Sequence, residues 1–316
     1  MAINKIYFAE FSDIRDNEWR VDIYKNPQGT ITAKQFVCAD PGFTLSWQGA
    51  EDIFSPLIPS TCSIPFIVET LDDAAFIVDL FTMDEGEYIV EIIRDPDRTA
   101  DLHWRGFLTS DNLTIPDDVR PYVVELQAVD GLQTLSRREH PETGNHLLSD
   151  IVVDALATIP TTERFDATEA FLRYGKDYIP QGFSPAISDP LREMKVAVTT
   201  IDPLTGEPGE SPTAENALVQ ILTLYNLRLF QVDGVWSIQP VTRILSGLST
   251  IPFNAVNKAG GVATGGTFVL PKYLETGTKK LVGNWSIQFL PPLRRITREL
   301  NYLGNRPLAG VEFPGF

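Results

Sequence analysis

The chain has 316 residues, of which 42 are acidic and 26 basic, so its formal net charge at pH 7 is −16. This balance argues against a grip on the nucleic-acid backbone, because such binding relies on concentrated lysine and arginine. The length favours two or three domains, and no stretch approaches the ~20 apolar residues that a helix needs to span a bilayer, so we expect no membrane partner.

From residue 6 to residue 129 the sequence predicts short strands separated by turn residues, which is typical of a β-barrel or a sandwich. The stretch GFTLSWQG places Phe43, Leu45 and Trp47 on one face. Pro65, within STCSIPFIVE, predicts an edge strand or a bulge, because proline cannot donate a main-chain hydrogen bond. The closing strand, YVVELQAVD (122–130), alternates apolar and polar residues as a half-buried antiparallel strand does.

One helix interrupts these strands. The segment LDDAAFIVDLFTMDEGEY (71–88) predicts a short helix that ends near Gly86. We expect Ala75, Val78 and either Leu80 or Phe81 to face inward.

The region after residue 137 changes character. Leu148, Ile151, Val152 and Ala155 recur at helical spacing, which predicts an amphipathic helix over about 147–158. Residues 160–212 are rich in Pro, Gly, Thr and Asp and predict loops, with 200–212 as the most flexible part.

A second helix is predicted over about 212–225, with Ser211 as its N-cap and Pro212 at its first position. A β-hairpin over about 227–240 follows directly. Its turn is Asp233-Gly234, a strong hairpin signal, and Trp236 lies in its second strand.

Residues 242–316 return to strand-like pieces separated by Gly and Pro. The segment VATGGT (262–267) lacks the lysine and the following helix of a phosphate-binding loop, and we expect an ordinary loop. The most basic stretch is LPPLRRITREL (290–300), with Arg294, Arg295 and Arg298. An inter-subunit ion-pairing patch against this chain's many carboxylates is favoured there over a nucleic-acid contact.

The predicted fold class is therefore α+β, mainly β, with two β-barrel-like domains separated by an α+β insert. The expected boundaries are 1–136 for the first barrel, 137–241 for the insert and 242–316 for a second, partial barrel.

Motifs of common catalytic sites are absent from the sequence, which has no P-loop, HExxH, GxSxG or EF-hand loop. Cys38 and Cys62 are the only cysteines, and together with three histidines they match no metal-ligand spacing. We expect neither a catalytic residue nor a cofactor or metal, and hence no enzymatic activity. The tryptophans are expected in the core rather than on a sugar-stacking surface; they are Trp19, Trp47, Trp104, Trp236 and Trp285.

Four segments carry a resemblance to a known family. In order they are LHWRGFLTSDNLTIP (102–116), YVVELQAVDGLQTL (122–135), NHLLSDIVVDALATI (145–159) and SPTAENALVQILTLYNLRLFQVDGVWSIQPV (211–241). They resemble tail-hub or baseplate-hub proteins of tailed bacteriophages, in which a W-x-G-[FY] strand precedes a strand ending in A-x-D-G-L-x-x-L. The residues that match are Trp104, Gly106, Asp130, Gly131 and Leu132, and in the last segment Asp233, Gly234 and Trp236.

On this resemblance the strand 122–129 completes a barrel and Asp130-Gly131 turns the chain out of it. Leu132 and Leu135 would then anchor the exit against the end of the barrel. A purely local turn at Asp130-Gly131 is the alternative.

The resemblance implies a structural virion protein at the tail tip, assembled in the host cytoplasm. Its expected partners are further copies of itself in a ring, with a trimer favoured over a hexamer, a tail-tube or distal-tail protein, and a spike or fibre protein. DNA is expected only as non-adhering cargo in the channel of the ring, with the acidic excess lining the channel.

A second functional class remains open. A carbohydrate-binding or glycan-cleaving β-protein would need exposed tryptophans and carboxylates in one cleft. Clustering of Trp19, Trp47 and Trp104 on a solvent-facing groove would favour this alternative. A capsid-associated or scaffold β-protein is a third candidate.

Overall fold

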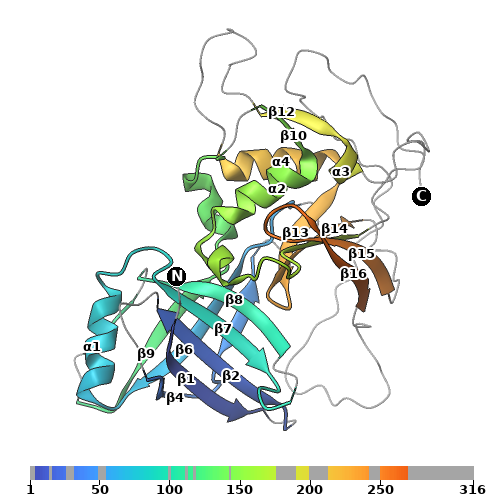
Figure 1. The fold of residues 1–316 in the computed structure, drawn as a ribbon. Helices are drawn as coiled ribbons and strands as arrows, with labels where there is room; N and C mark the ends of the chain where they lie inside the picture. Colours follow the sequence, from blue (N-terminus) through green and yellow to red (C-terminus); the bar gives the residue numbers. More distant parts are fainter. Residues whose placement is uncertain are drawn as a thin grey trace, which may run out of the picture.

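The structure is a computed structural model. It describes residues 4–13, 16–25, 32–48, 55–98, 101–110, 113–116, 119–141, 144–175, 190–198, 213–241 and 250–269. The fold is mainly β, with a barrel-like sheet at one end and a layer of helices above a second sheet at the other (Figure 1). This confirms the predicted class. Among the described helices none has the length and apolar character that a bilayer crossing requires.

The first sheet runs in the order β3-β1-β2-β7-β8-β9-β6-β4, and β5 also pairs with β6. Its longer strands are β1 (Asn4–Ser12), β2 (Glu18–Lys25), β6 (Ser60–Val68), β7 (Tyr88–Arg94), β8 (Asp101–Thr109) and β9 (Tyr122–Val129). The short strands are β3 (Lys34–Gln35), β4 (Val37–Cys38) and β5 (Thr44–Trp47). The predicted alternation of β9 is confirmed, because Val124, Leu126 and Ala128 are buried whereas Glu125 is exposed.

A single stretch of chain nearly closes this sheet into a barrel. Within residues 34–38, β3 pairs with β1 at one edge of the sheet, and β4 pairs with β6 at the other edge. Phe36 lies between these two strands, is buried, and stacks on Phe66 with ring centroids 4.8 Å apart. The two edges of the sheet are therefore joined by consecutive residues, and edge exposure is reduced.

Pro65 lies in a strand with partners on both sides, so the predicted edge position is wrong. β6 pairs along its length with β9. On its other side β5 pairs with residues 60–63 and β4 with residues 66–67, so the ladder is interrupted at Pro65. This interruption accommodates a residue that has no N–H to donate.

Helix α1 (Leu71–Leu80) begins with a capping box in which Thr70 and Asp73 bond reciprocally. The expected inward face is only partly right, because Phe76, Ile77 and Leu80 are buried whereas Ala75, Val78 and Phe81 are exposed. The aromatic rings inside the barrel decide the orientation: Phe76 packs against Tyr7, Phe66 and Tyr88. The helix also ends at Leu80, earlier than the predicted end near Gly86.

The tryptophans divide into two groups. Trp104 and Trp236 are each 1 % exposed, as expected for core residues. Trp19 is half-buried, and Trp47 is 45 % exposed because its strand β5 pairs only with β6, at the margin of the sheet. Trp285 lies outside the described residues.

The insert contains both predicted helices. They are α2 (Leu148–Ala157) and α4 (Ala214–Leu224), and Leu148, Ile151, Val152 and Ala155 are all buried. The N-cap of α4 is Thr213 rather than Ser211, because the Thr213 side chain accepts a hydrogen bond from the backbone N–H of Asn216. The other elements are η1 (Leu132–Arg137), β10 (Gly144–Leu147), η2 (Pro160–Arg164), β11 (Leu172–Gly175), α3 (Pro190–Glu193) and β12 (Lys195–Val198).

The second sheet has the order β13-β14-β11-β15-β16. It comprises the predicted hairpin β13 (Leu227–Val232) and β14 (Val235–Pro240), together with β15 (Thr250–Val256) and β16 (Val262–Val269). It thus includes strands from both sides of the expected boundary between residues 241 and 242. Residues 200–212 and 270–316 lie outside the described residues, so the flexible loop and the second barrel both stay predictions.

The segment VATGGT is part of strand β16, so the predicted loop is wrong. Its main chain pairs with β15, and a register shift between Phe253 and Ala255 accommodates the two strands. The Phe253 ring packs beside the main chain of Gly266. Backbone pairing rather than side-chain pattern makes this segment a strand.

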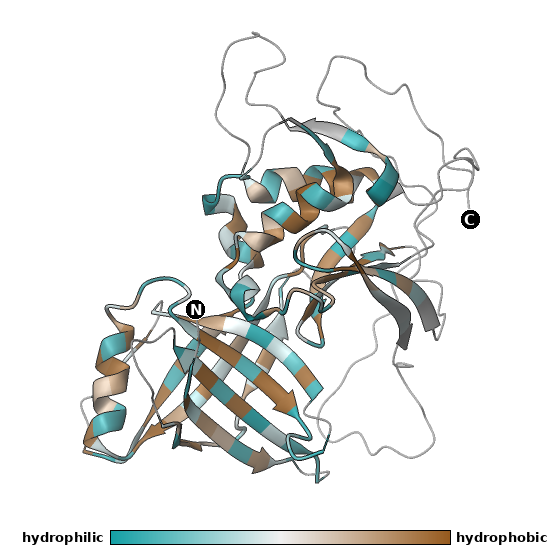
Figure 2. Ribbon diagram, in the orientation of Figure 1, coloured by the Kyte–Doolittle hydropathy of each residue, from teal (hydrophilic) through white to brown (hydrophobic). Residues whose placement is uncertain are grey.

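The residues that the structure describes form two hydrophobic cores. One fills the barrel, and the other lies between α2, α4 and the second sheet. Brown apolar bands mark both in Figure 2. Phe107 of β8 and Val129 of β9 belong to the second core although their strands are part of the barrel. The end of the barrel therefore forms one wall of the core of the insert.

Candidate functional site: the junction between barrel and insert

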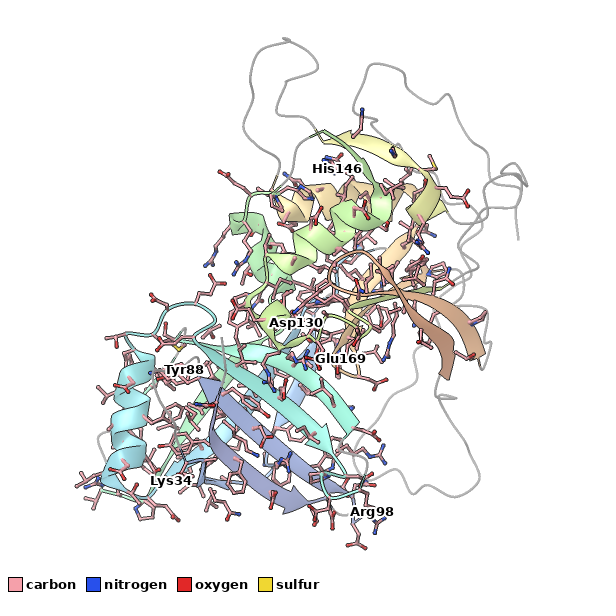
Figure 3. The ribbon with its side chains drawn as sticks, in the orientation of Figure 1. Lys34, Tyr88, Arg98, Asp130, His146 and Glu169 are labelled. Carbon is pink, nitrogen blue, oxygen red and sulfur yellow. The ribbon has the colours of Figure 1, made fainter. Side chains whose placement is uncertain are left out.

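Three strands of the barrel bring a buried hydrogen-bond network together where the chain leaves the barrel. The Trp104 indole Nε1 on β8 donates to Oγ of Ser60 on β6 at 2.9 Å, and Ser60 Oγ donates to Oδ2 of Asp130 at 2.6 Å. The backbone N–H of Ser60 donates to the same carboxylate oxygen at 2.7 Å, and the Leu132 N–H donates to Oδ1 at 3.0 Å. Asp130 therefore links the start of β6 to the first residue of η1. Figure 3 shows it at the boundary between the barrel and the helical layer.

The Asp130 carboxylate is fully buried, and no ion pair to it is present among the described residues. Burial raises the pKa of Asp130 to about 6, although its hydrogen bonds from Ser60 and Leu132 act in the opposite direction. The charged form at neutral pH is thus stabilised by three donors rather than by a cation.

Gly106 and Gly131, two of the three glycines of the resemblance, occupy places that a larger residue would not fit. A Cβ at Gly106 would overlap the Trp104 ring and the carbonyl oxygen of Val129. Gly131 has a φ of 99°, and a Cβ there would lie 2.5 Å from Cγ2 of Ile159. The chain consequently turns sharply and stays close to the insert.

The residues after this turn enter the core of the insert. Leu132 and Leu135 of η1 are 1 % and 0 % exposed, and they belong to the same cluster as Phe107 and Val129 from the barrel. Asp130-Gly131 is thus part of the packing between two cores rather than an isolated local turn.

A second contact joins the hairpin to β8. The Gln231 side chain accepts from the Arg105 backbone N–H at 2.7 Å and donates to its carbonyl oxygen at 2.8 Å. At the hairpin turn, where Asp233 and Gly234 both have positive φ, Gly234 packs against Leu102 of β8. The hairpin therefore contacts the same strand that carries Trp104 and Gly106.

Beside this contact, Glu91 on β7 bridges two arginines. Its Oε1 lies 2.9 Å from Nε of Arg105 on β8, and its Oε2 lies 3.0 Å from Nη2 of Arg164 on η2. Burial alone would raise the pKa of Glu91, but the two guanidinium groups hold it below its usual range. The guanidinium of Arg105 also lies over the Phe165 ring, 4.3 Å from its centroid.

The structure thus brings together five residues of the resemblance at one junction: Trp104, Gly106, Asp130, Gly131 and Leu132. Asp233 and Gly234 contact the barrel elsewhere on β8, and Trp236 is buried in the core of the insert. Arg294, Arg295 and Arg298 lie outside the described residues. Ser60 and Glu91 are not predicted from the sequence. For Glu91 there was a signal, because it is a lone glutamate in the apolar run YIVEIIR.

The surroundings of these groups limit their chemistry. Ser60 and Asp130 are each 0 % exposed, so no substrate reaches them without opening the core. Cys38 and Cys62 are free, and burial raises the pKa of both thiols, which disfavours the reactive thiolate.

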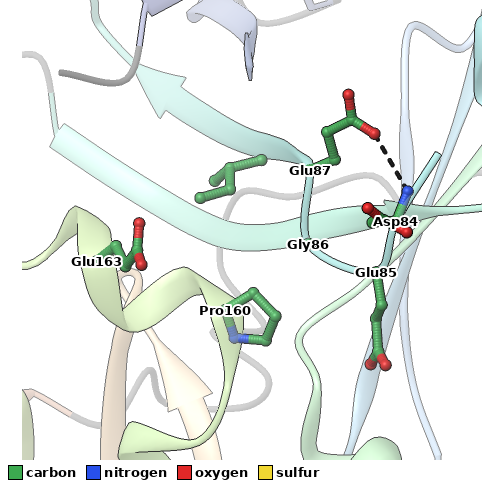
Figure 4. A pocket seen from close by; sticks show the side chains of 7 residues that line it. Asp84, Glu85, Gly86, Glu87, Pro160 and Glu163 are labelled. Atoms are coloured by element: carbon green, nitrogen blue, oxygen red, sulfur yellow. Dashed lines mark hydrogen bonds between the residues drawn. The ribbon is translucent and has the colours of Figure 1, made fainter. Parts of the chain in front are cut away.

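A cavity of about 350 Å³ lies between the turn before β7 and η2, lined by Asp84, Glu85, Gly86, Glu87, Ile89, Pro160 and Glu163 (Figure 4). Two carboxylates of its wall are already engaged. Glu87 accepts from the backbone N–H of Asp84 at 3.1 Å and lies 3.0 Å from Nζ of Lys25, and Glu85 lies 2.8 Å from Nη2 of Arg138. Within the part of the chain that the structure describes, no three His, Cys, Asp or Glu side chains are placed to hold a metal ion.

Comparison with known proteins gives a limited result. No family model matches the chain, and no curated protein matches it. Among solved structures, a tail protein from Neisseria meningitidis MC58 aligns with a TM-score of 0.34 and 14 % identity, over 62 % of this chain and 50 % of the other. The chain thus spans about half the length of that tail protein. A likeness of this extent defines neither a shared family nor a shared function.

Proposed function

We propose that the protein is a structural component of a bacteriophage tail tip, a hub that assembles into a ring between the tail tube and the spike or fibre. One observation supports this proposal above the others. Five of the residues that carry the resemblance to tail-hub proteins converge on a single buried junction around Asp130, although they lie up to 28 positions apart in the sequence: Trp104, Gly106, Asp130, Gly131 and Leu132. If this chain and the tail-hub proteins share a fold, the residues that match between them should pack together at one place, as these residues do.

In the proposed role the protein has no catalytic function. The network of Trp104, Ser60 and Asp130 is closed to solvent, and it holds the barrel against the insert. A rigid connection between these two parts suits a ring subunit that must present fixed surfaces to different neighbours above and below.

The acidic composition has a role within the same proposal. With a net charge of −16, the protein repels the phosphate backbone, and carboxylates that face the lumen of the ring would let DNA pass without adhering. Neutralising the lumen-facing carboxylates should then slow DNA ejection and leave assembly intact. Carboxylates that face outward from the ring would contradict this part of the proposal.

The carbohydrate alternative receives limited support from the tryptophans. Trp104 is inside the protein and donates to Ser60, so it is not available for stacking on a sugar. Trp19 packs against Phe43 and His103, and Trp47 is the exposed one of the three.

Solution mass by light scattering, combined with negative-stain images of the same sample, tests the proposal. A trimer or hexamer with a central hole is the expected result. A monomer at every concentration that binds glycans in an array screen would contradict the proposal and favour the carbohydrate alternative.

A further inference from the structure

Helix α1 is apolar on two opposite sides, but the barrel covers only one of them. The covered side carries Phe76, Ile77 and Leu80. The other side carries four exposed residues, which we call the outer stripe: Leu71 (72 % exposed), Ala75, Val78 (58 %) and Phe81 (49 %). These residues recur at spacings of three and four, as on a helix face that packs against a partner.

The charges beside the outer stripe are acidic. Asp72 and Asp79 are exposed, and neither forms an ion pair within the described part of the chain. The nearby Lys34 is already engaged by Asp73 at 2.8 Å. The last turn of α1 contains no basic residue, so Asp79 lies close to the negative end of the helix dipole without compensation. Asp72 lies in the first turn, where the helix dipole favours a negative charge, so a cation supplied from outside would chiefly compensate Asp79.

The sequence contains a segment of the opposite character. In LPPLRRITREL (290–300), Leu293, Ile296 and Leu300 recur at spacings of three and four, and three arginines lie beside them: Arg294, Arg295 and Arg298. This pattern predicts an apolar stripe flanked by positive charge, whereas α1 offers an apolar stripe flanked by negative charge. Arginine is also the residue best suited to pair with carboxylates at an interface.

We propose that the outer stripe of α1 binds the segment 290–300 of a neighbouring copy of this chain, with the arginines pairing Asp72 and Asp79. This inference rests on the proposed ring function, for which it names one interface. A neighbouring copy is named as the occupant because a ring needs a contact between two different surfaces of adjacent subunits. A contact between two different surfaces generates a closed ring when the rotation from one subunit to the next closes, and an open filament when it does not.

The apolar half of the interface is tested with the double variant Leu71→Ser/Val78→Ser. Both side chains are exposed in the single chain, so its folding should be unaffected. Light scattering over a concentration series should show an apparent dissociation constant at least tenfold higher than that of the unaltered protein. The matched control is Val262→Ser, which changes an equally exposed valine (67 %) on β16 and should leave the mass unchanged.

The charged half is tested by exchanging charges. One variant changes α1 and is Asp72→Lys/Asp79→Lys; the other changes the segment and is Arg294→Glu/Arg295→Glu/Arg298→Glu. Each variant alone should dissociate the assembly. A chain that carries both sets of changes should restore at least part of it. Arg98→Glu is the control, because Arg98 is exposed at the β7–β8 turn, away from α1 (Figure 3). Circular dichroism would verify that each variant is folded.

An assembly that keeps its mass in both α1 variants would overturn this inference but leave the ring proposal standing. If each charge exchange leaves the mass of the assembly unchanged but lowers the free energy of unfolding, and the combination restores that free energy, the contact lies within one chain and the inference is overturned as well. An unaltered protein that stays monomeric at all concentrations would overturn both proposals.

Discussion

Replacing Ser60 with alanine should destabilise the protein far more than its size suggests. The Ser60 hydroxyl donates to the buried Asp130 carboxylate and accepts from Trp104 Nε1. A hydrogen bond to a charged group contributes about 1.5–3 kcal/mol, and a buried donor left without an acceptor costs about 1–3 kcal/mol. We therefore expect Ser60→Ala to lower the free energy of unfolding by about 3 kcal/mol or more at pH 8.

The loss should depend on pH, because it depends on the charge of Asp130. The pKa of Asp130 in the folded protein is raised to about 6. Since this value exceeds that of the unfolded chain, about 3.9, the contribution of this group to stability is fully present below pH ~4 and is lost as the pH rises through 6. Without the Ser60 donor the folded pKa rises further, so Ser60→Ala should be less harmful at pH 5, where the carboxyl is mostly protonated.

Denaturant unfolding followed by tryptophan fluorescence at pH 5 and pH 8 measures both effects. Ser63→Ala is the matched control on the same strand, because the Ser63 hydroxyl bonds to Glu125 near the surface. It should change the free energy of unfolding by less than about 0.5 kcal/mol. Equal losses for the two variants, or a Ser60→Ala loss that is the same at both pH values, would refute the reasoning.

The junction and the ion bridge give two further predictions. Gly131→Ala should lower the free energy of unfolding by about 1–3 kcal/mol, because the residue has a φ of 99° and a Cβ would contact Ile159; an unchanged urea midpoint would contradict this. Glu91→Gln should cost about 3–5 kcal/mol in the same assay, because Arg105 and Arg164 would lose their shared carboxylate. Because the pKa of Glu91 is lowered in the folded protein, its contribution to stability is present above the pKa of the unfolded chain, near 4.3, and is lost as the pH falls through the folded pKa. A Glu91→Gln loss of stability that stays equally large in strong acid would contradict a lowered pKa for Glu91.

Local patterns predicted the elements whose formation depends on neighbours in the sequence. The helices α2 and α4 follow from the spacing of Leu148 and Ile151 and of similar residues, and the hairpin follows from Asp233-Gly234. In α1 the same periodicity was present on both sides of the helix, so it could not decide which side faces inward. The aromatic residues that decide it, Tyr7 and Tyr88, come from distant strands.

The junction shows the same limit at longer range. The sequence marked Asp130 and Gly131 as a turn, but Ser60, which supplies two of the three donors to the carboxylate, is 70 residues away. A serine at the start of a predicted strand has no local feature that identifies it as a partner. Sheet pairing between β6 and β9 determines this contact, and that pairing is not encoded in either segment alone.

The residues on which the resemblance to tail-hub proteins rests are therefore different from those that would form the contact between subunits. Trp104, Asp130 and Leu132 face inward, and their substitution should lower the stability of the single chain whether or not it is assembled. Leu71 and Val78 face outward, and their substitution should change the mass of the assembly while the single chain stays equally stable. Because the first set maintains the fold and the second is the one proposed to bind a neighbouring copy, related chains can share the buried junction and still differ in the partners that they bind.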